Sequence, residues 1–448
     1  MTTTTIDLLD ELRWRGLLHQ STDEAQLREH LASGRRKIYA GFDPTADSLT
    51  IGNLVPIIAL VHVARAGHDP IVLMGGGTGL IGDPSGKSAE RQLMTRETVD
   101  RHIDGQRRIF DGVFTHAGLG SPRVVNNADW LSKVSFLDAL RDTGKHFSVN
   151  AMMQKESVKE RLHNREQGIS YTEFSYMILQ AYDFRHLHEH EGVTVQCGGS
   201  DQWGNITAGI ELIRKSTAVR HGLEGRLDEG ERIFRGKVAL SHGFTMPLVT
   251  KSDGGKFGKT ESGAVWLTPD RTSPFAMHQF WLNTADDDVE RFLKVFTLLG
   301  REEIESLVAR HAESPGAREA QRTLANEATA LVHGRDQAAA AEEAGRALFS
   351  GDIATLPEAI FREVLAEAPS SEHAIADLQA GVSPVDLLVE TGLASSKRQA
   401  REFLTQGSVS VNGRKIGLDE SLGEADLLHG SLLAIRRGKK QWHLTVWK

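Results

Sequence analysis

Residues 38–54 read IYAGFDPTADSLTIGNL, and the organisation of the whole chain depends on this stretch. It begins as a short apolar strand that Asp43 and Pro44 end, because the residue before proline avoids the α region and proline cannot donate to a strand ladder. The apolar run from Val55 to Val63 then predicts a helix whose first N–H groups can bind an anion. Two interpretations stay open: a site for a phosphate-bearing small molecule, with Gly52 letting it approach the backbone, or an ordinary strand–turn–helix connection.

A second strand is predicted at Ile71–Met74, where four apolar residues follow one another without a break. It opens into a glycine-rich loop, GGGTGLIGDPSGK, at residues 75–87. This loop is not a Walker phosphate loop, since the leading glycine of that motif would fall on Ile81. Two such strands joined by a helix predict an α/β fold with a doubly wound, nucleotide-type parallel sheet. Ligands bind at the carboxyl ends of such strands.

Polar residues also follow two later strands. Val124-Val125 leads into Asn126–Trp130, and Thr194–Gly199 leads into the sequence SDQWGN of residues 200–205. Both polar runs would lie at strand ends, where ligands of parallel sheets bind.

One predicted helix carries polar residues on a single face. It runs from Tyr171 to Asp183, and Tyr176, Gln180 and Asp183 are spaced i, i+4 and i+7. The rest of the helix is rich in Met, Ile and Leu, so a solvent-facing surface fits it poorly. This face is therefore predicted to line a polar pocket.

Lysines alternate with glycines in KSDGGKFGKT, residues 251–260. A mobile cationic loop of this kind can clamp transferring phosphates, and the alternative is a plain solvated turn. The charged residues 216–240 before it predict a surface excursion. From Thr284 to about Leu348 the sequence is predicted to be helical, and residues 350–382 are predicted to be a loosely patterned connection.

The composition is that of a globular protein, with 40% hydrophobic and 25% charged residues among 448, a length that suggests roughly three domains. Its single cysteine, Cys197, excludes an internal disulfide framework and a cysteine-built zinc site. No protein-built metal site is expected. No run is apolar enough to span a bilayer, so we expect a cytoplasmic protein without a membrane partner.

Charge is distributed unevenly along the chain. Residues 383–448 contain 10 Lys and Arg against 7 Asp and Glu, whereas residues 1–382 contain 42 against 53. A basic C-terminal module on an acidic body is typical of a local nucleic-acid contact, and a solvated basic face is the alternative. The module is predicted to contain two short helices, a strand with a turn, and a closing hairpin.

Five stretches resemble the bacterial tyrosyl-tRNA synthetases, which are class I aminoacyl-tRNA synthetases. They are GFDPTADSL at 41–49, GLIGDPS at 79–85, GKHFSVN at 144–150, GGSDQWGN at 198–205 and KFGKT at 256–260. The end of the chain resembles the S-four type RNA-binding domain. The resemblance implies a Rossmann-like catalytic domain at 1–245, a mobile lysine loop and linker at 246–270, an α-helical domain at 271–365 and an α+β RNA-binding domain at 383–448.

The resemblance also implies a homodimer that activates tyrosine with ATP and then esterifies tRNA(Tyr). ATP is a substrate, and Mg²⁺ is expected with its phosphates. Residues implied to act on the phosphates during catalysis are Thr45, Thr50, Asn53, Lys256, Lys259 and Thr260. Residues implied to bind tyrosine are Tyr39 and Asp183 at the phenol, Asp83, Tyr176 and Gln180 at the amino group, and Gln202. Residues implied to bind ATP are Asp43, Gly52, Gly199, Asp201 and Lys259. The basic residues expected to bind RNA are Lys397, Arg398, Arg401, Arg436, Arg437, Lys439 and Lys440.

The sequence departs from the family pattern at the start of the first helix. The usual His-Ile-Gly-His is Thr50-Ile51-Gly52-Asn53 here, and Ala40 stands where many relatives have a cysteine. Two other functions stay open: a synthetase for tryptophan, and an RNA-binding relative that has lost activation. A Tyr39/Asp183 pair facing a phenol favours tyrosine, and the intact lysine loop speaks against a loss of activation.

Overall fold

The computed structural model describes residues 6–83, 94–155, 158–159, 169–220, 241–252, 254–255, 257–260, 263–366, 368–438 and 441–448. The chain forms two compact units. The first comprises residues 1–273 and 283–334, and the second comprises residues 274–282 and 335–448.

A six-stranded sheet forms the centre of the first unit, in the spatial order β1-β6-β5-β2-β3-β4. Among these strands β2 to β6 run parallel, and the short edge strand β1 is antiparallel to β6. The predicted α/β fold with a doubly wound parallel sheet is therefore confirmed. The strands are β1 (Gln20–Ser21), β2 (Lys37–Phe42), β3 (Asp69–Met74), β4 (Arg123–Asn126), β5 (Val193–Gly199) and β6 (His242–Met246).

The order of the strands reverses between β2 and β5. On one side β2 pairs with β3, the next strand in the chain, and on the other side with β5, which follows only after β3 and β4. The connections that leave β2 and β5 therefore diverge. At such a point a crevice opens outside the carboxyl ends of the two strands.

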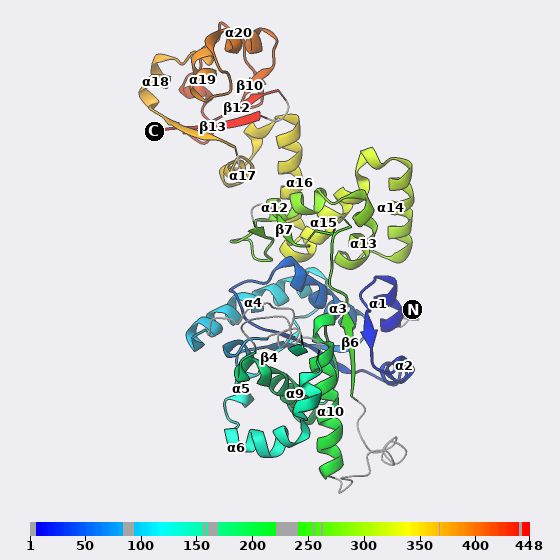
Figure 1. Cartoon of the computed structure of the whole chain (residues 1–448). Helices are drawn as coiled ribbons and strands as arrows, with labels where there is room; N and C mark the ends of the chain where they lie inside the picture. Colours follow the sequence, from blue (N-terminus) through cyan, green and yellow to red (C-terminus); the bar gives the residue numbers. More distant parts are fainter. Residues whose placement is uncertain are drawn as a thin grey trace. The chain divides into compact units, whose positions relative to one another are not determined.

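Alternate residues of β2 face different helical layers, because side chains of a strand point to opposite faces in turn. Tyr39 packs against Phe184 of α9 (Tyr171–Glu191), whereas Phe42 packs against Phe110 of α4 (Arg96–His116). Figure 1 shows α3 (Leu54–Arg65) with α4 on one side of the sheet, and α9 with α10 (Trp203–Arg220) on the other. The smaller helices are α1 (Leu8–Trp14), α2 (Glu24–Ala32), α5 (Ala128–Leu131), α6 (Phe136–Asp138) and α7 (Val149–Met153).

Three later helices also belong to the first unit: α13 (Asp286–Phe296), α14 (Arg301–Glu313) and α15 (Glu319–His333). α13 packs on α3, and α15 packs on α4. The buried Arg15, directly after α1, donates hydrogen bonds of 2.7–2.9 Å to the carbonyls of Lys294, Thr297 and Leu299. The last carbonyls of a helix lack partners inside it, so Arg15 fixes the end of α13.

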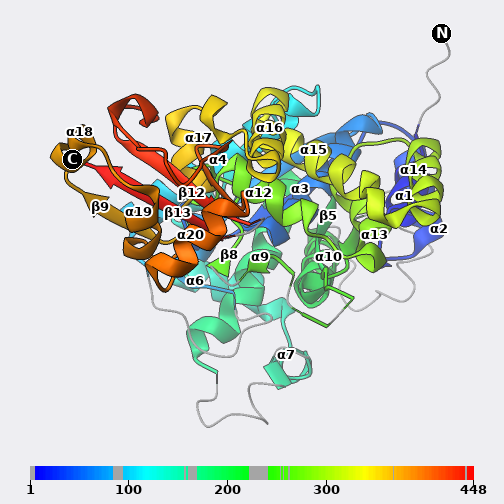
Figure 2. The same cartoon turned by 90° about the horizontal axis from the view of Figure 1, so that it is seen from above.

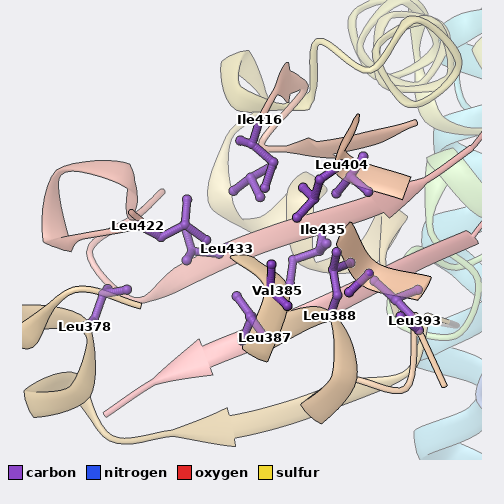
Figure 3. Packing of buried hydrophobic residues seen from close by; sticks show 14 of the residues in the cluster. Leu378, Val385, Leu387, Leu388, Leu393, Leu404, Ile416, Leu422, Leu433 and Ile435 are labelled. Carbon is purple, nitrogen blue, oxygen red and sulfur yellow. The ribbon is translucent and has the colours of Figure 1, made fainter. Parts of the chain in front are cut away.

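The second unit combines helices with a five-stranded sheet of order β11-β10-β12-β13-β9. On one face of this sheet Leu432, Ala434 and Leu444 are buried with Phe361. On the other face Leu433 and Ile435 pack against the two helices α19 and α20, as Figure 3 shows. Its elements are α12 (Pro274–Leu282), α16 (Arg335–Ser350), α17 (Glu358–Val364), β9 (Ser370–His373), α18 (Ile375–Ala380), α19 (Pro384–Glu390), α20 (Lys397–Thr405), β10 (Val409–Val411), β11 (Arg414–Lys415), β12 (Leu432–Arg437) and β13 (Gln441–Trp447).

The structure departs from the sequence predictions in three places. The surface excursion predicted at residues 216–240 begins inside α10, which runs to Arg220 with Ser216 and Ala218 buried, and residues 221–240 lie outside the described residues. Residues 350–382, predicted as a connection, contain α17, β9 and α18, and β9 pairs with β13. The sequence of β9, SSEH, lacks the alternation of apolar and polar residues that marks a half-buried strand. β9 lies at the edge of the sheet, where a polar strand is tolerated. β6 was not predicted either, because HGFTM has only two large apolar residues, although all five of its residues are buried. The limits assigned to the four domains stay predictions.

Candidate functional site

A cavity of about 740 Å³ opens at the carboxyl ends of β2 and β5, where the strand order reverses. The face of α9 predicted to line a pocket does so, with Tyr176, Gln180 and Asp183 all on the cavity wall. The cavity brings together these residues from the sequence prediction: Tyr39, Asp43, Thr45, Thr50, Gly52, Asn53, Asp83, Tyr176, Gln180, Asp183, Gly199, Asp201 and Gln202.

Asp183 and Tyr39 lie in the wall of this cavity and are shielded from solvent. The carboxylate of Asp183, 1% exposed, accepts hydrogen bonds from the Asn127 amide at 2.8 Å and from the Trp130 indole N–H at 2.7 Å. Burial nevertheless raises the pKa of the Asp183 carboxyl from 3.8 to about 7. The buried Tyr39 hydroxyl has no hydrogen-bond partner among the described residues. Burial, and then the nearby Asp183 charge, raise the pKa of that hydroxyl well above 10.

Asn127 links this pair to a second carboxylate. Its amide nitrogen also donates to Thr78 Oγ1 at 3.0 Å, and Thr78 in turn donates to Asp43 Oδ1 at 2.8 Å. The other oxygen of Asp43 accepts the Tyr176 hydroxyl proton at 2.9 Å. The two carboxylates of Asp183 and Asp43 are thus held by one chain of side-chain hydrogen bonds, which fixes their separation and orientation.

The glycine-rich loop after β3 packs against this network. A Cβ atom at Gly75 would lie 2.2 Å from Asp43 Oδ1 and 2.6 Å from Thr78 Oγ1, and one at Gly79 would lie 2.9 Å from Pro44 Cδ. Side chains at these two positions would collide with the groups that hold Asp43. The glycines therefore serve close packing within the protein.

A second group of amides lies beside Asp83. Gln202 Nε2 donates to Asp83 Oδ2 at 2.7 Å and to Asp201 Oδ2 at 3.0 Å. Asn205 donates to the side-chain oxygens of Gln180, at 2.9 Å, and Gln202, at 3.2 Å. This arrangement presents carboxylate and amide oxygens, which are acceptors suited to a cationic or hydroxyl-bearing ligand.

The turn before α3 is organised by Thr50 and Asn53. Asn53 Oδ1 accepts from the Thr50 backbone N–H at 3.0 Å and from the Thr50 hydroxyl at 2.9 Å. The hydroxyl proton of Thr50 is therefore directed to Asn53. With its oxygen engaged, Asn53 has its amide nitrogen left as the donor that can serve a ligand.

The lysine segment meets this turn through backbone contacts. Ile51 N–H donates to Val265 O at 2.9 Å, and Val265 N–H donates to Gly258 O at 3.0 Å. Gly258 has φ +76°, and a Cβ there would lie 2.6 Å from Ile51 Cγ2, so glycine is required on both counts. Lys256 lies outside the described residues. For Lys259 and Thr260 the structure describes the backbone, as β7 (Lys259–Thr260), which pairs with β8 (Gly263–Ala264).

The basic residues of the second unit differ in their engagement. Arg398 and Arg401 are exposed on α20, whereas Lys397 forms an ion pair with Asp386 at 2.6 Å. Arg437 donates to the Leu393 carbonyl at 2.6 Å and lies over the Phe403 ring. Arg436 lies over the Trp442 ring. Lys439 and Lys440 are outside the described residues.

Metal-binding clusters of three or more His, Cys, Asp or Glu side chains are absent from the part of the chain that the structure describes. Within the same residues, none of the helices combines the length and apolar content that crossing a membrane requires.

Thr78, Asn127 and Trp130 are site residues that sequence reasoning did not assign. Asn127 and Trp130 lie in the polar run recognised after the third strand, so their position at a strand end was a usable signal. Thr78 is the one hydroxyl residue among the glycines of residues 75–79. Its role depends on its distance to Asp43, which only the fold supplies.

Known proteins resemble this chain over its whole length. Residues 32–350 match the family described as tRNA synthetases class I (W and Y), and residues 361–445 match the tyrosine–tRNA ligase SYY-like C-terminal domain. The tyrosine–tRNA ligase of Bacillus caldotenax is 49% identical over 98% of this chain and 99% of its own length. That of Staphylococcus carnosus is 46% identical over 99% and 100%. The crystal structure of a C-terminally truncated mitochondrial tyrosyl-tRNA synthetase from Aspergillus nidulans superposes with a TM-score of 0.67. It is 32% identical and covers 77% of this chain and 94% of that one.

Proposed function

The chain belongs to the class I tRNA synthetases of the tryptophan and tyrosine type, and on this basis we propose how its cavity performs the reaction of a tyrosine–tRNA ligase. That reaction, which is the activity of this protein, joins L-tyrosine and ATP to tyrosyl-adenylate and pyrophosphate and then transfers the tyrosyl group to the 3′ end of tRNA(Tyr). The observation that best supports tyrosine as the substrate is the Tyr39 hydroxyl, which finds no hydrogen-bond partner in the described part of the chain, beside the buried Asp183 carboxylate.

A phenol fits this pair of groups better than an indole does. The phenol hydroxyl can accept a hydrogen bond from Tyr39 and donate one to Asp183, whereas an indole N–H can only donate. A phenylalanine side chain can do neither, and would leave buried polar groups unsatisfied. The other end of tyrosine is assigned to Asp83, Tyr176 and Gln180, whose oxygen atoms suit its α-ammonium group.

The first chemical step requires no general base. The tyrosine carboxylate, already ionised at pH 7, attacks the α-phosphorus of ATP, the new C–O–P linkage forms, and the bond to pyrophosphate breaks with its electron pair. Catalysis therefore consists of positioning and of donors aimed at the charge that develops. We assign the ribose and adenylate to Asp43, Gly199 and Asp201, with Gly52 beside the phosphates. Gln202, which donates to Asp83, is assigned to the tyrosine site. Mg²⁺ carried by the ATP phosphates would neutralise part of their charge.

Asp183→Asn should reduce both tyrosine affinity and its dependence on pH. In the free protein Asp183 takes up a proton below about pH 7, where it no longer accepts the phenol hydrogen bond as a carboxylate. Tyrosine affinity should therefore fall as pH decreases from 8 to 6, approaching tenfold per unit below the pKa. The Asn variant should bind tyrosine more weakly, without that slope, and should discriminate less against phenylalanine. The measurements are equilibrium binding across pH and ATP–pyrophosphate exchange with tyrosine, phenylalanine and tryptophan.

Glu189→Gln is the matched control, because it removes a charge near the end of the same helix and outside the cavity. Glu189→Gln should keep the wild-type dependence of tyrosine affinity on pH and the wild-type ratio of activity with tyrosine to activity with phenylalanine. An unchanged tyrosine/phenylalanine ratio in Asp183→Asn would remove Asp183 from the phenol pocket. Absence of tyrosine-dependent exchange in the wild-type protein would instead favour an RNA-binding relative that has lost activation.

Lys259→Ala is expected to slow adenylate formation more than Thr50→Ala. Lys256, Lys259 and Thr260 are proposed to act on the pyrophosphate together with Thr45, Thr50 and Asn53. The Lys259 ammonium would add a full positive charge beside the phosphates, whereas Thr50 is neutral and its hydroxyl proton is directed to Asn53. Since Thr50 donates to Asn53, Thr50→Ala and Asn53→Ala should cause similar losses, and the double variant should lose little more. The measurement is the pre-steady-state rate of adenylate formation at saturating tyrosine for these three single variants and the double variant. This rate should show no ionisation near pH 6.5 from residues 50–53, because no histidine is present there.

A larger effect of Thr50→Ala than of Lys259→Ala would show that this ranking is wrong. Additive losses in the Thr50/Asn53 double variant would mean that the two side chains act on the phosphates independently.

Arg398 and Arg401 are proposed as the leading tRNA contacts of the second unit, with Lys397, Arg436, Arg437, Lys439 and Lys440 contributing to the basic surface. Replacing both Arg398 and Arg401 with Ala should raise the KM for tRNA about tenfold. The slope of the logarithm of the binding constant against the logarithm of salt concentration should decrease by roughly one for each lost phosphate contact. Adenylate formation should be unaffected. Arg362→Ala, which removes an exposed arginine paired with Glu358 in the same unit, is the control. Equal losses in charging and in activation would contradict this separation.

A homodimer is proposed from the apolar surface of the first unit. Phe136, Leu137, Leu140, Val149, Met153 and Tyr171 are six of the nine exposed large hydrophobic residues within the described part of the chain. They fall within 36 positions of the sequence, and Figure 2 shows α7, which carries two of them, at the periphery of this unit. Such a concentration is typical of a protein–protein interface. Leu137→Asp should convert the dimer to a monomer by light scattering, while Leu418→Asp, elsewhere on the surface, should not.

We infer a cytoplasmic location from the single cysteine, Cys197, which is buried and unpaired.

A further inference from the structure

Helix α13 holds the start of the lysine segment through its first turn. The buried carboxylate of Asp288 accepts the Ser252 backbone N–H at 3.1 Å from each oxygen, and the Ser252 hydroxyl at 3.0 Å. Arg291, nearly one turn later, donates to Asp288 Oδ1 at 2.6 Å and also to the Thr250 carbonyl. Residues 250 and 252 are thus fixed to the helix by both backbone and side-chain groups.

The same helix holds the segment again five residues later. The Phe257 ring stacks on Phe296, with centroids 5.1 Å apart and planes 16° apart, and meets Phe292 edge-on at 5.2 Å. Phe292 and Phe296 lie one turn apart on α13. Phe257 is two residues before Lys259, so this packing limits where the backbone of Lys259 can lie.

Helix α13 is itself fixed relative to the turn that carries Thr50 and Asn53. Its end is held by the buried Arg15, and its side packs on α3, which begins at this turn. Gly258 lies against Ile51 of the same turn. The lysine segment is therefore positioned between α13 and the start of α3.

We propose that Asp288 is a positioning residue for adenylate formation, which sets the place of Lys259 by fixing Ser252 at the base of the segment. The proposal rests on the role assigned above to Lys259 at the pyrophosphate. Loss of the carboxylate removes the acceptor of the Ser252 N–H and hydroxyl and one of the two acceptors of the Arg291 guanidinium. Of these bonds, only the one from Arg291 to the Thr250 carbonyl then remains, so Ser252 is free to move. A displacement of about 1 Å in a catalytic group can lower a rate by roughly 100-fold.

The test compares Asp288→Ala, Asp288→Asn and Asp287→Ala in the full-length protein. Asp288→Ala should lower the rate constant of adenylate formation per active site by about 10- to 100-fold, with the tyrosine Kd within twofold of wild type. Asp288→Asn keeps an acceptor for Ser252 and should recover part of the rate. Asp287 is an exposed carboxylate in the same turn, so Asp287→Ala removes the same charge from the helix start and should behave as wild type.

Active-site titration and thermal unfolding, measured on each variant, separate positioning from loss of folded protein. Should Asp288→Ala fail to fold, Ser252→Ala removes one hydrogen bond and should show a smaller loss with the same split between rate and tyrosine affinity. An unchanged rate per site, a parallel loss of tyrosine affinity, or an equal loss in Asp287→Ala would overturn the proposal. Lys259→Ala, measured in parallel, separates a failure of the role proposed for Lys259 from a failure of the role proposed for Asp288. If Lys259→Ala forms adenylate as fast as wild type, the role assigned to the lysine fails independently of Asp288.

Discussion

The central constraint of this structure is the pairing of β2 with β3 on one side and β5 on the other, in parallel register on both sides. Parallel strands end at the same edge, so the loops after β2, β3 and β5 must meet there. The reversal of strand order then keeps the two connections apart and leaves the cavity between them. The alternation of β2 adds the second requirement, because it directs Tyr39 toward α9, the helix that carries Asp183.

Burial of Asp183 explains why the polar network around the cavity is so extensive. A buried carboxylate is costly unless its oxygens are satisfied, and two donors from the segment after β4 meet that need. These two donors do not keep the pKa of Asp183 at its ordinary value, so the ionised carboxylate remains incompletely stabilised. A ligand that brings another hydrogen-bond donor would stabilise it further. The phenol of tyrosine is such a ligand.

Local signals in the sequence predict the fold, the strand ends and one helical wall of the cavity, whereas the roles of Tyr39, Asp43 and Asp83 come from the family resemblance. Apolar runs mark β2 and β3, and the spacing of Tyr176, Gln180 and Asp183 places them on one face. The missed parts depend on distant contacts. β6 is short of apolar residues and gains its burial from neighbouring strands, while β9 is polar because it lies at an edge. Asn127 could be recognised as polar but not as the link between two carboxylates, since its partners Thr78 and Asp183 lie 49 and 56 positions away.

The end of the cavity proposed to bind phosphates differs in its chemistry from the end proposed to bind the phenol. Where relatives carry two imidazoles, Thr50 and Asn53 form a neutral pair in which one side chain is the acceptor of the other. Neither can add positive charge, so at the start of α3 the protein offers amide hydrogens and the helix end alone. In the proposed function, full positive charge comes from the lysine segment. The position of that segment is decided by contacts with α13, whose residues lie over 230 positions after Thr50 yet within the same compact unit. Because Thr50 and Asn53 at the start of α3 carry no charge, catalysis relies more on the position of the lysine segment. That position is set by α13, whose own sequence carries no recognisable catalytic motif.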